Sequence, residues 1–510
     1  MAVKVYSAQV TGLKADIVEV EVDMAAGFLH HFTVVGLPDK AVEEAKDRIS
    51  AAIKNSGFIS PQKKNQRITV SLAPADLKKE GPVFDLAIAL AYLLASKQTF
   101  FDIKKKLFLG ELGLDGLIRP IKGTLALVKY AQKAGFKEIF VPKENAEEAG
   151  LIKGLKIFGC GNLKDIISHL DSRENFLLTE QPETKIDFGE IQKETLLDFV
   201  DIKGQETAKR GLEIAAAGGH NILMVGPAGT GKTMLARAFS DILPPPSFEE
   251  ILEMTLIHSV AGGLNGGFLR QRPFRSPHHT SSYVALVGGG TYPKPGEITL
   301  SHRGVLFLDE FPEFERRVIE ALRQPLEDGV INVSRAKESI TFPARFIMIC
   351  AMNPCPCGNL GSKIKPCVCS QGGLMRYQRK ISGPIVDRID IWLEVPQIEH
   401  EKLSDVKNVG ETSKEIQKRV MVARERQKER FNSHGKKILT NSEMGVRDLK
   451  IFCLLSGQVT NILNQAAKRL DLSSRAYHRV IKLARTIADL EGTEQINESH
   501  ILEALQYRPK

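Results

Sequence analysis

The spacing of apolar residues predicts a mixed domain over residues 1–170. Apolar and polar positions alternate in residues 17–22 and 67–72, as expected for strands with one buried face. Residues 40–55 have helical spacing, and residues 84–95 form the longest apolar run of the chain, which predicts a core helix. Because the region contains both strand-like and helix-like segments, we expect an α+β domain here.

The rest of the chain divides into three stretches. Residues 171–196 are polar and lack sustained periodicity, which predicts a linker. Residues 197–396 contain two nucleotide-binding motifs, and we expect an α/β core there. Residues 397–510 include segments rich in Ala, Leu, Lys and Arg, notably 414–430 and 475–490, which predict a helical C-terminal domain.

A phosphate-binding loop follows the apolar run 222–225, which is typical of a buried strand. Residues 226–233 fit the pattern GxxxxGK[ST] in full, and a helix is predicted to begin after them. In such a loop, backbone N–H groups point at the phosphates, the lysine reaches the terminal phosphates, and the hydroxyl can bind Mg²⁺. The expected ATP-binding residues are Gly226, Pro227, Ala228, Gly229, Thr230, Gly231, Lys232 and Thr233.

A second apolar run, residues 304–308, ends in the carboxylates of Asp309 and Glu310. This is the pattern of a Walker B strand. We expect Asp309 and Thr233 to hold Mg²⁺, and Glu310 to polarise the attacking water. The order and separation of the two motifs favour ATP hydrolysis.

The composition is that of a folded multidomain protein. Of its 510 residues, 43% are hydrophobic and 26% are charged, which allows large cores. The N-terminus lacks a basic segment followed by an apolar one, and the apolar run 84–95 is too short for a bilayer. We therefore expect a cytoplasmic protein without a membrane partner. The net charge of +9 permits a nucleic-acid partner, although solvated lysines give the same sum.

Seven cysteines without a secretory signal argue against a disulfide framework. Four of them form two C-x-C pairs, which could make a tetrahedral structural zinc site. A redox pair or four unligated thiols is the alternative, because C-x-C is tighter than the common C-x₂-C spacing. The candidate zinc ligands are Cys355, Cys357, Cys367 and Cys369.

Several longer phrases surround these motifs. They are RPFRSPHH at 272–279, PGEI at 295–298, LFLDE at 306–310, LRQPLEDG at 322–329 and SGPIVDRID at 382–390. With these phrases the chain from residue 198 onward resembles an AAA+ ATPase of the magnesium-chelatase-like YifB/ComM group. The combination is far more specific than the phosphate-binding loop alone.

The resemblance implies a hexameric ring with ATP between protomers and a helical lid at the C-terminus. It places Asn353 at the sensor 1 position, where an amide can orient water or contact the γ-phosphate. Arg388 matches the arginine finger, which acts on the neighbouring subunit's phosphate, and Arg475 matches sensor 2 on the lid. For either arginine alone, the alternative is a surface ion pair of little energetic value.

The N-terminal domain resembles the non-ATPase domain of Lon proteases. The resemblance is carried by Gly81-Pro82, by residues 110–116 and by residues 141–145. Proteolysis in that family needs a serine and a lysine. The matching positions here hold Val83 and Leu127, so the resemblance implies a Lon-like fold without peptidase activity.

Two segments are candidates for substrate contact. Residues 268–294 are basic and glycine-rich, and residues 330–342 alternate like a hairpin with Arg335 and Lys337 near its turn. In related ring helicases such hairpins grip the nucleic-acid backbone. The alternative is a solvated hairpin whose basic residues are ordinary surface side chains. His278 and His279 are adjacent, and we expect them to point to opposite faces of an extended chain rather than to bind one metal ion.

The leading functional hypothesis is an ATP-driven motor on DNA, a helicase similar to ComM proteins that promote branch migration when single-stranded DNA is integrated. The expected partners are DNA and further copies of the chain, and the expected cofactors are ATP and Mg²⁺. A protein-remodelling motor is the alternative. A magnesium-chelatase subunit ranks last. Magnesium chelatase needs a separate metal-binding, integrin-like subunit, and this chain carries a fused Lon-like domain instead.

Overall fold

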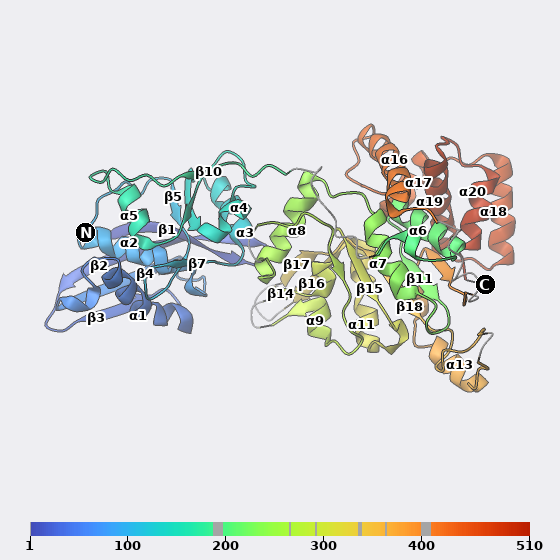
Figure 1. The fold of residues 1–510 in the computed structure, drawn as a ribbon, viewed down its shortest axis with the longest axis horizontal. Coiled ribbons are helices and arrows are strands. Elements are labelled where there is room, and N and C mark those ends of the chain that lie inside the picture. The colour runs from blue at the N-terminus through green and yellow to red at the C-terminus, as the bar shows by residue number, and fades with distance from the viewer. Residues whose placement is uncertain are drawn as a thin grey trace. The chain divides into compact units, whose positions relative to one another are not determined.

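A computed structural model of the protein describes residues 2–186, 197–264, 267–290, 293–334, 339–362, 365–398 and 410–509. The chain forms two compact units (Figure 1). Unit 1 comprises Met1–Gly189 and Ser247–Arg270, and unit 2 comprises Glu190–Pro246 and Gln271–Lys510. The segment 247–270 therefore packs in unit 1, although it lies between the two nucleotide motifs in the sequence.

Unit 1 contains a four-stranded sheet in the order β1–β2–β4–β3. Strands β1, β2 and β4 pair antiparallel, while β3 is parallel to β4. Helix α2 packs on β1 and β2, and it is buried along almost its whole length. Strands β2 and β4 and helices α1 and α2 confirm the predicted strands and helices, while β1 and β3 were not predicted. Their bounds are β1 (Val3–Thr11), β2 (Lys14–Ala26), β3 (His31–Val35), β4 (Gln66–Ala73), α1 (Lys40–Asn55) and α2 (Asp85–Ala95).

A second sheet of unit 1 has the order β10–β9–β8–β5. Its short strand β10 comes from the stretch predicted as a linker, and it pairs antiparallel with β9. Helix α3 packs against α8, the helix that the segment 247–270 contributes. The bounds are β5 (Lys106–Phe108), β8 (Glu138–Pro142), β9 (Lys156–Cys160), β10 (Glu180–Gln181), α3 (Thr124–Lys133), α4 (Ala146–Ala149), α5 (Leu163–Leu170) and α8 (Phe248–Ala261).

Unit 2 is built on a five-stranded parallel sheet in the order β12–β15–β18–β11–β19. The central strands are apolar throughout, and β15 and β18 are buried at every position. Continuous apolar runs are typical of parallel strands covered on both faces. The bounds are β11 (Ile222–Val225), β12 (Phe274–Arg275), β15 (Val305–Leu308), β18 (Ile347–Met352), β19 (Ile391–Glu394), α6 (Glu206–Gly218) and α7 (Lys232–Ile242).

The predicted hairpin forms from β16 (Val330–Ser334) and β17 (Ser339–Pro343), which pair antiparallel. Arg335 and Lys337, the two predicted DNA contacts, lie outside the described residues. Several short helices connect the strands of unit 2, and one of them, α12, contacts β16. They are α9 (Tyr283–Val287), α10 (Glu297–Leu300), α11 (Arg316–Ala321), α12 (Arg323–Asp328), α13 (Gln371–Gln378) and α14 (Gly383–Val386).

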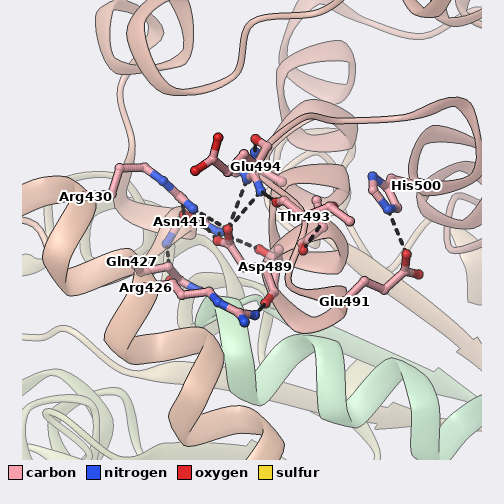
Figure 2. Close-up of polar contacts among 12 residues, drawn as sticks. Arg426, Gln427, Arg430, Asn441, Asp489, Glu491, Thr493, Glu494 and His500 are labelled. Atoms are coloured by element: carbon pink, nitrogen blue, oxygen red, sulfur yellow. Dashed lines mark hydrogen bonds and ion pairs between the residues drawn. The ribbon is translucent and has the colours of Figure 1, made fainter.

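The C-terminal part of unit 2 is helical, as predicted, and shares one apolar core with the parallel sheet. A buried polar network joins its helices around Asp489 (Figure 2). Gln427 of α16 also donates to the carbonyl of Ala217 in α6, which ties the helices to the phosphate-binding core. The bounds are α16 (Ser413–Asn432), α17 (Val446–Phe452), α18 (Gly457–Arg469), α19 (Ser474–Glu491) and α20 (Glu498–Gln506).

Across the described residues, every helix is too short or too polar to cross a lipid bilayer.

Candidate nucleotide-binding site

The carboxyl ends of three neighbouring strands of unit 2 bring the predicted motifs together. The phosphate-binding loop follows β11, Asp309 and Glu310 follow β15, and Asn353 follows β18, which lies between the other two strands. Parallel strands end at the same edge of a sheet, and open α/β sheets bind ligands at this edge. Strand order thus assembles one site from segments that are distant in the sequence.

The loop fits tightly against the neighbouring strand at Gly226. A Cβ atom there would lie 2.1 Å from the carbonyl oxygen of Val395, so only glycine is accommodated. The loop then leads into α7, which begins at Lys232. The free N–H groups of a helix N-terminus attract phosphate, which is the chemistry that the sequence pattern predicts.

Lys232 is buried, and it donates hydrogen bonds inside its own loop. Its Nζ lies 2.7 Å from the carbonyl oxygen of Gly226, 2.9 Å from that of Pro227 and 3.2 Å from Oδ1 of Asn353. Burial lowers the pKa of Lys232, while the carboxylate of Asp309 opposes that shift. The structure therefore brings Lys232, Asn353 and Asp309 into one cluster.

Thr233 and Asp309 contact each other directly. The Thr233 hydroxyl donates to Oδ2 of Asp309 over 2.8 Å. A hydroxyl and a carboxylate at this separation supply the hard oxygen ligands that Mg²⁺ prefers. These are the two residues that the sequence assigned to the metal ion.

Glu310 has a partner that the sequence did not predict. Its side-chain Oε2 lies 3.0 Å from Nδ1 of His279, and its backbone adopts a φ of 51°. The rings of His278 and His279 lie 4.2 Å apart at an interplanar angle of 33°. The expectation of opposite orientations was wrong, because the two residues enter a turn rather than an extended segment.

Arg388 and Arg475 meet at one carboxylate. Nη2 of Arg388 lies 2.6 Å from Oε1 of Glu327, and Nη2 of Arg475 lies 2.8 Å from the same oxygen. The Arg388 guanidinium holds the pKa of the Glu327 carboxyl below its usual range, and Arg475 adds to the effect. Glu327 lies in the motif LRQPLEDG, but nothing in the local sequence indicated that Arg388 and Arg475 would contact it.

The four clustered cysteines converge, and their Sγ atoms all lie within 4.8 Å of one another. The Sγ atom of Cys355 lies 3.4 Å from that of Cys357, and the Sγ atom of Cys367 lies 3.7 Å from each of them. Four sulfurs around a tetrahedral zinc ion, with Zn–S bonds of about 2.3 Å, are about 3.8 Å apart. The geometry fits a structural zinc site.

Backbone groups support thiolates in this cluster. The Leu360 N–H donates to Sγ of Cys355 over 3.2 Å. Hydrogen bonds from the backbone N–H groups of Asn359 and Val368 lower the pKa of Cys357 to about 6. Metal ligation needs the thiolate form, so these contacts favour it at Cys357, whereas the neighbouring sulfurs raise the pKa of Cys369 to about 12. The other cysteines, Cys160, Cys350 and Cys453, are buried.

The cysteine loop borders the phosphate-binding loop. Gly358 has a φ of 78°, and a Cβ atom there would lie 3.7 Å from Cβ of Ala228 and 3.8 Å from Nδ2 of Asn353. The backbone N–H of Asn353 also hydrogen-bonds to Tyr377 of α13, whose pKa burial raises to about 12. The loop that carries the cysteines passes close to Asn353, and α13, which follows that loop, hydrogen-bonds to it.

Two arginines of the basic segment 268–294 bind other groups of the protein itself. Arg275 forms hydrogen bonds of 2.6 and 2.7 Å to Glu297, and Arg272 donates to the backbone carbonyls of Pro244 and Arg303. These contacts hold the part of the segment from residue 271 onward within unit 2. Neither arginine is therefore a simple surface cation of the kind that a phosphate backbone attracts.

Together, the loop, the acidic strand end and the asparagine define a P-loop nucleotide-binding protein. Three family profiles match the chain: "Magnesium chelatase, subunit ChlI" at residues 198–403, "Subunit ChlI of Mg-chelatase" at 20–145 and "Magnesium chelatase, subunit ChlI C-terminal" at 410–508. Two similar relatives span almost the same length. The competence protein ComM of Haemophilus influenzae is 44% identical over 99% of this chain and 97% of its own. The uncharacterized protein YifB of Escherichia coli is 43% identical over 99% of this chain and 96% of its own.

The chain belongs to the YifB/ComM family of magnesium-chelatase-like AAA+ proteins. Membership of this family indicates an ATPase that uses ATP and Mg²⁺. The site described above contains the residue types that this chemistry needs.

Proposed function

We propose that the nucleotide site hydrolyses ATP with the following division of roles. Lys232 and the loop bind the β- and γ-phosphates, Thr233 and Asp309 hold Mg²⁺, and Glu310 polarises the attacking water. Asn353 orients that water or contacts the γ-phosphate. The observation that carries this proposal is the convergence of Lys232 and Asn353, 3.2 Å apart, at one edge of the parallel sheet.

We further propose that ATP hydrolysis drives movement on DNA, as a branch-migrating helicase that acts in recombination. The full-length likeness to a protein named competence protein ComM supports this. The net charge of +9 and the β16–β17 hairpin, with Arg335 and Lys337 in its turn sequence, are compatible with phosphate contacts. The active unit is a hexameric ring with ATP between subunits and with the C-terminal helices as its lid.

One experiment tests this function directly. ATP turnover of the purified chain is measured alone, with forked or branched DNA, and with an unfolded polypeptide. We expect branched DNA to stimulate turnover. Stimulation by the polypeptide and not by DNA would contradict the DNA proposal and favour a protein-remodelling motor.

We also propose a structural zinc ion at Cys355, Cys357, Cys367 and Cys369. The separations of their Sγ atoms and the N–H···S contacts support it. Zinc would cross-link the loop that borders Ala228 and Asn353, and so would keep both residues in place for ATP.

For the N-terminal domain we propose a Lon-like fold without peptidase activity. Val83 and Leu127, the residues at the positions matched to the catalytic pair, carry neither a nucleophile nor a base. A peptidase assay on denatured substrates, with and without ATP, tests this proposal, and we expect no cleavage.

A further inference from the structure

The stretch between Asn353 and Asp387 is basic and free of acidic side chains. Residues 354–386 contain neither aspartate nor glutamate, whereas the whole chain has 61 acidic residues among 510. A surface with cations and without carboxylates is typical of contact with a polyanion. The basic residues of this stretch are Lys363, which lies outside the described residues, Lys365, Arg376, Arg379 and Lys380.

Helix α13 places two of these arginines on one open face. Gly372, Met375, Arg376 and Arg379 follow the i, i+3, i+4, i+7 spacing of a single helix face. Met375 is 57% exposed, and a Cβ atom on Gly372 would meet nothing within 4 Å. Tyr377, on the opposite side, is buried. The face with the arginines is therefore free to contact another molecule.

Neither arginine of this face has a carboxylate partner among the described residues. The Nε of Arg376 donates to the backbone carbonyl of Gly372 over 3.3 Å, which leaves its charge unneutralised. The next basic residue, Lys380, differs, because it pairs with Glu313 at 2.7 Å. Arg376 and Arg379 are both exposed. A phosphate group can therefore bind them without first breaking an ion pair.

The helix is anchored close to both arginines. Cys369 precedes α13 by two positions, and its Sγ atom lies within 4.8 Å of those of the other three clustered cysteines. Tyr377 hydrogen-bonds to the backbone N–H of Asn353. In Figure 1, α13 projects from the parallel sheet of unit 2. An anchored helix offers its arginines in a fixed arrangement, which reduces the entropy lost when a partner binds.

The side chains of this surface suit a nucleic acid. Arginine binds phosphate oxygens in a fork geometry, and glutamine donates to phosphates and to base edges. Gln371 and Gln378 are exposed on the same helix, and Met375 adds apolar surface for a sugar or a base. Charge complementarity and these polar groups together favour a phosphate backbone.

We propose that Arg376 and Arg379 of α13 bind the phosphate backbone of a nucleic-acid strand, as a contact surface additional to the β16–β17 hairpin. This inference rests on the proposed action on DNA. It does not depend on ATP hydrolysis, because both arginines lie outside the nucleotide motifs.

Affinity measurements test whether the two charges bind the strand. The double substitution Arg376→Ala and Arg379→Ala should weaken binding of a labelled single-stranded DNA about 5- to 10-fold at low salt. The slope of log affinity against log salt should fall by about 0.7 for each lost phosphate contact. Replacing both arginines with lysine should keep most of the affinity, because lysine also binds phosphate as a point charge.

Helix α17 supplies the matched control. Arg447 and Lys450 are exposed there with the same three-residue spacing, and their replacement with alanine removes the same charge. We expect this control to bind DNA as the unsubstituted chain does. Unchanged affinity after the α13 alanine substitutions, or an equal loss in the α17 control, would overturn the proposal.

Photo-crosslinking separates this inference from the proposed motor. In a chain with Lys232→Ala, p-benzoylphenylalanine takes the place of Met375 or, as a control, of Val422 on α16, which is 53% exposed. We expect crosslinks to single-stranded DNA from position 375 alone. Stimulation of ATP turnover by DNA in the unsubstituted chain, without crosslinks from position 375, would refute the inference alone. Crosslinks from position 375, without any stimulation of the unsubstituted chain by DNA, would uphold the inference and refute the proposed motor.

Two other occupants of this surface would give different results. If another copy of the chain covered it, the alanine substitutions at Arg376 and Arg379 would change the mass of the assembly in light scattering. If an acidic protein segment covered it, polyglutamate would suppress the crosslink from position 375 as well as unlabelled DNA does at equal charge. We expect an unchanged mass and competition by DNA alone, and either of the other results would overturn the proposal.

Discussion

Nδ1 of His279 lies 3.0 Å from Oε2 of Glu310, the carboxylate that we propose polarises the attacking water. The glutamate is 56% exposed, and His279 is the ion-pair partner that the described residues give its side chain. His279 comes from the segment before β15, and it reaches Glu310 because the chain turns at this point. We infer that His279 positions the glutamate for hydrolysis.

His279→Ala should lower kcat for ATP by about 10-fold and leave KM nearly unchanged, because a misplaced carboxylate impairs the chemical step more than binding. Steady-state turnover measures both constants. His278→Ala is the matched control, since the His278 ring hydrogen-bonds to Thr280 instead. Equal effects of both substitutions would contradict a specific role for His279.

Lys232→Ala should abolish tight ATP binding, whereas Glu310→Gln should bind ATP and fail to hydrolyse it. The lysine neutralises phosphate charge in the ground state, while the glutamate acts only on the attacking water. Fluorescent nucleotide titration and phosphate release distinguish the two outcomes. Unchanged turnover in Glu310→Gln would remove that residue from the mechanism.

Metal analysis should find about one zinc ion per chain, and Cys367→Ser should lower both the zinc content and the melting temperature. Structural zinc contributes on the order of 10 kcal/mol in small sites. Val368→Ser is the matched control, because Val368 lies between two candidate ligands and is 82% exposed. Metal-free protein of unchanged stability would show that the cysteines are plain thiols.

Asp489→Ala should destabilise the C-terminal helices by about 3–5 kcal/mol, because it leaves buried Arg485 without its carboxylate. Arg430 and Asn441 lose the same partner (Figure 2). Denaturant unfolding measures the loss. Glu425→Ala should cost less than about 0.5 kcal/mol, since its pair with Lys428 is exposed. Equal effects would contradict a central role for Asp489.

Replacing Arg335 and Lys337 with alanine should weaken DNA binding about equally for all sequences. Each lost phosphate contact should lower the slope of log affinity against log salt by about one. ATP turnover without DNA should persist, because neither residue belongs to the nucleotide motifs. A double substitution of Lys63 and Lys64, exposed lysines of unit 1, controls for lost charge. Unchanged DNA affinity together with lost stimulation by an unfolded polypeptide would favour the remodelling alternative.

Local sequence patterns were sufficient to predict those sites whose chemistry requires particular residues at consecutive positions. The loop 226–233 needs glycines and Lys-Thr in a fixed order, a Walker B strand needs carboxylates directly after an apolar run, and a C-x-C pair is itself a candidate chelate. The strands at 17–22 and 67–72 and the helices at 40–55, 84–95, 414–430 and 475–490 could be predicted as well, because their apolar positions recur with the period of the element.

The sequence by itself therefore determined the nucleotide motifs, the cysteine cluster and several of the helices and strands in each unit. Only the tertiary structure decided that Glu327 joins Arg388 to Arg475, that His279 contacts Glu310, and that residues 247–270 pack in unit 1. These relationships depend on strand order and helix packing, which bring distant segments together. Which segments meet is decided by the packing of the whole core, so a short pattern of residues does not encode these contacts.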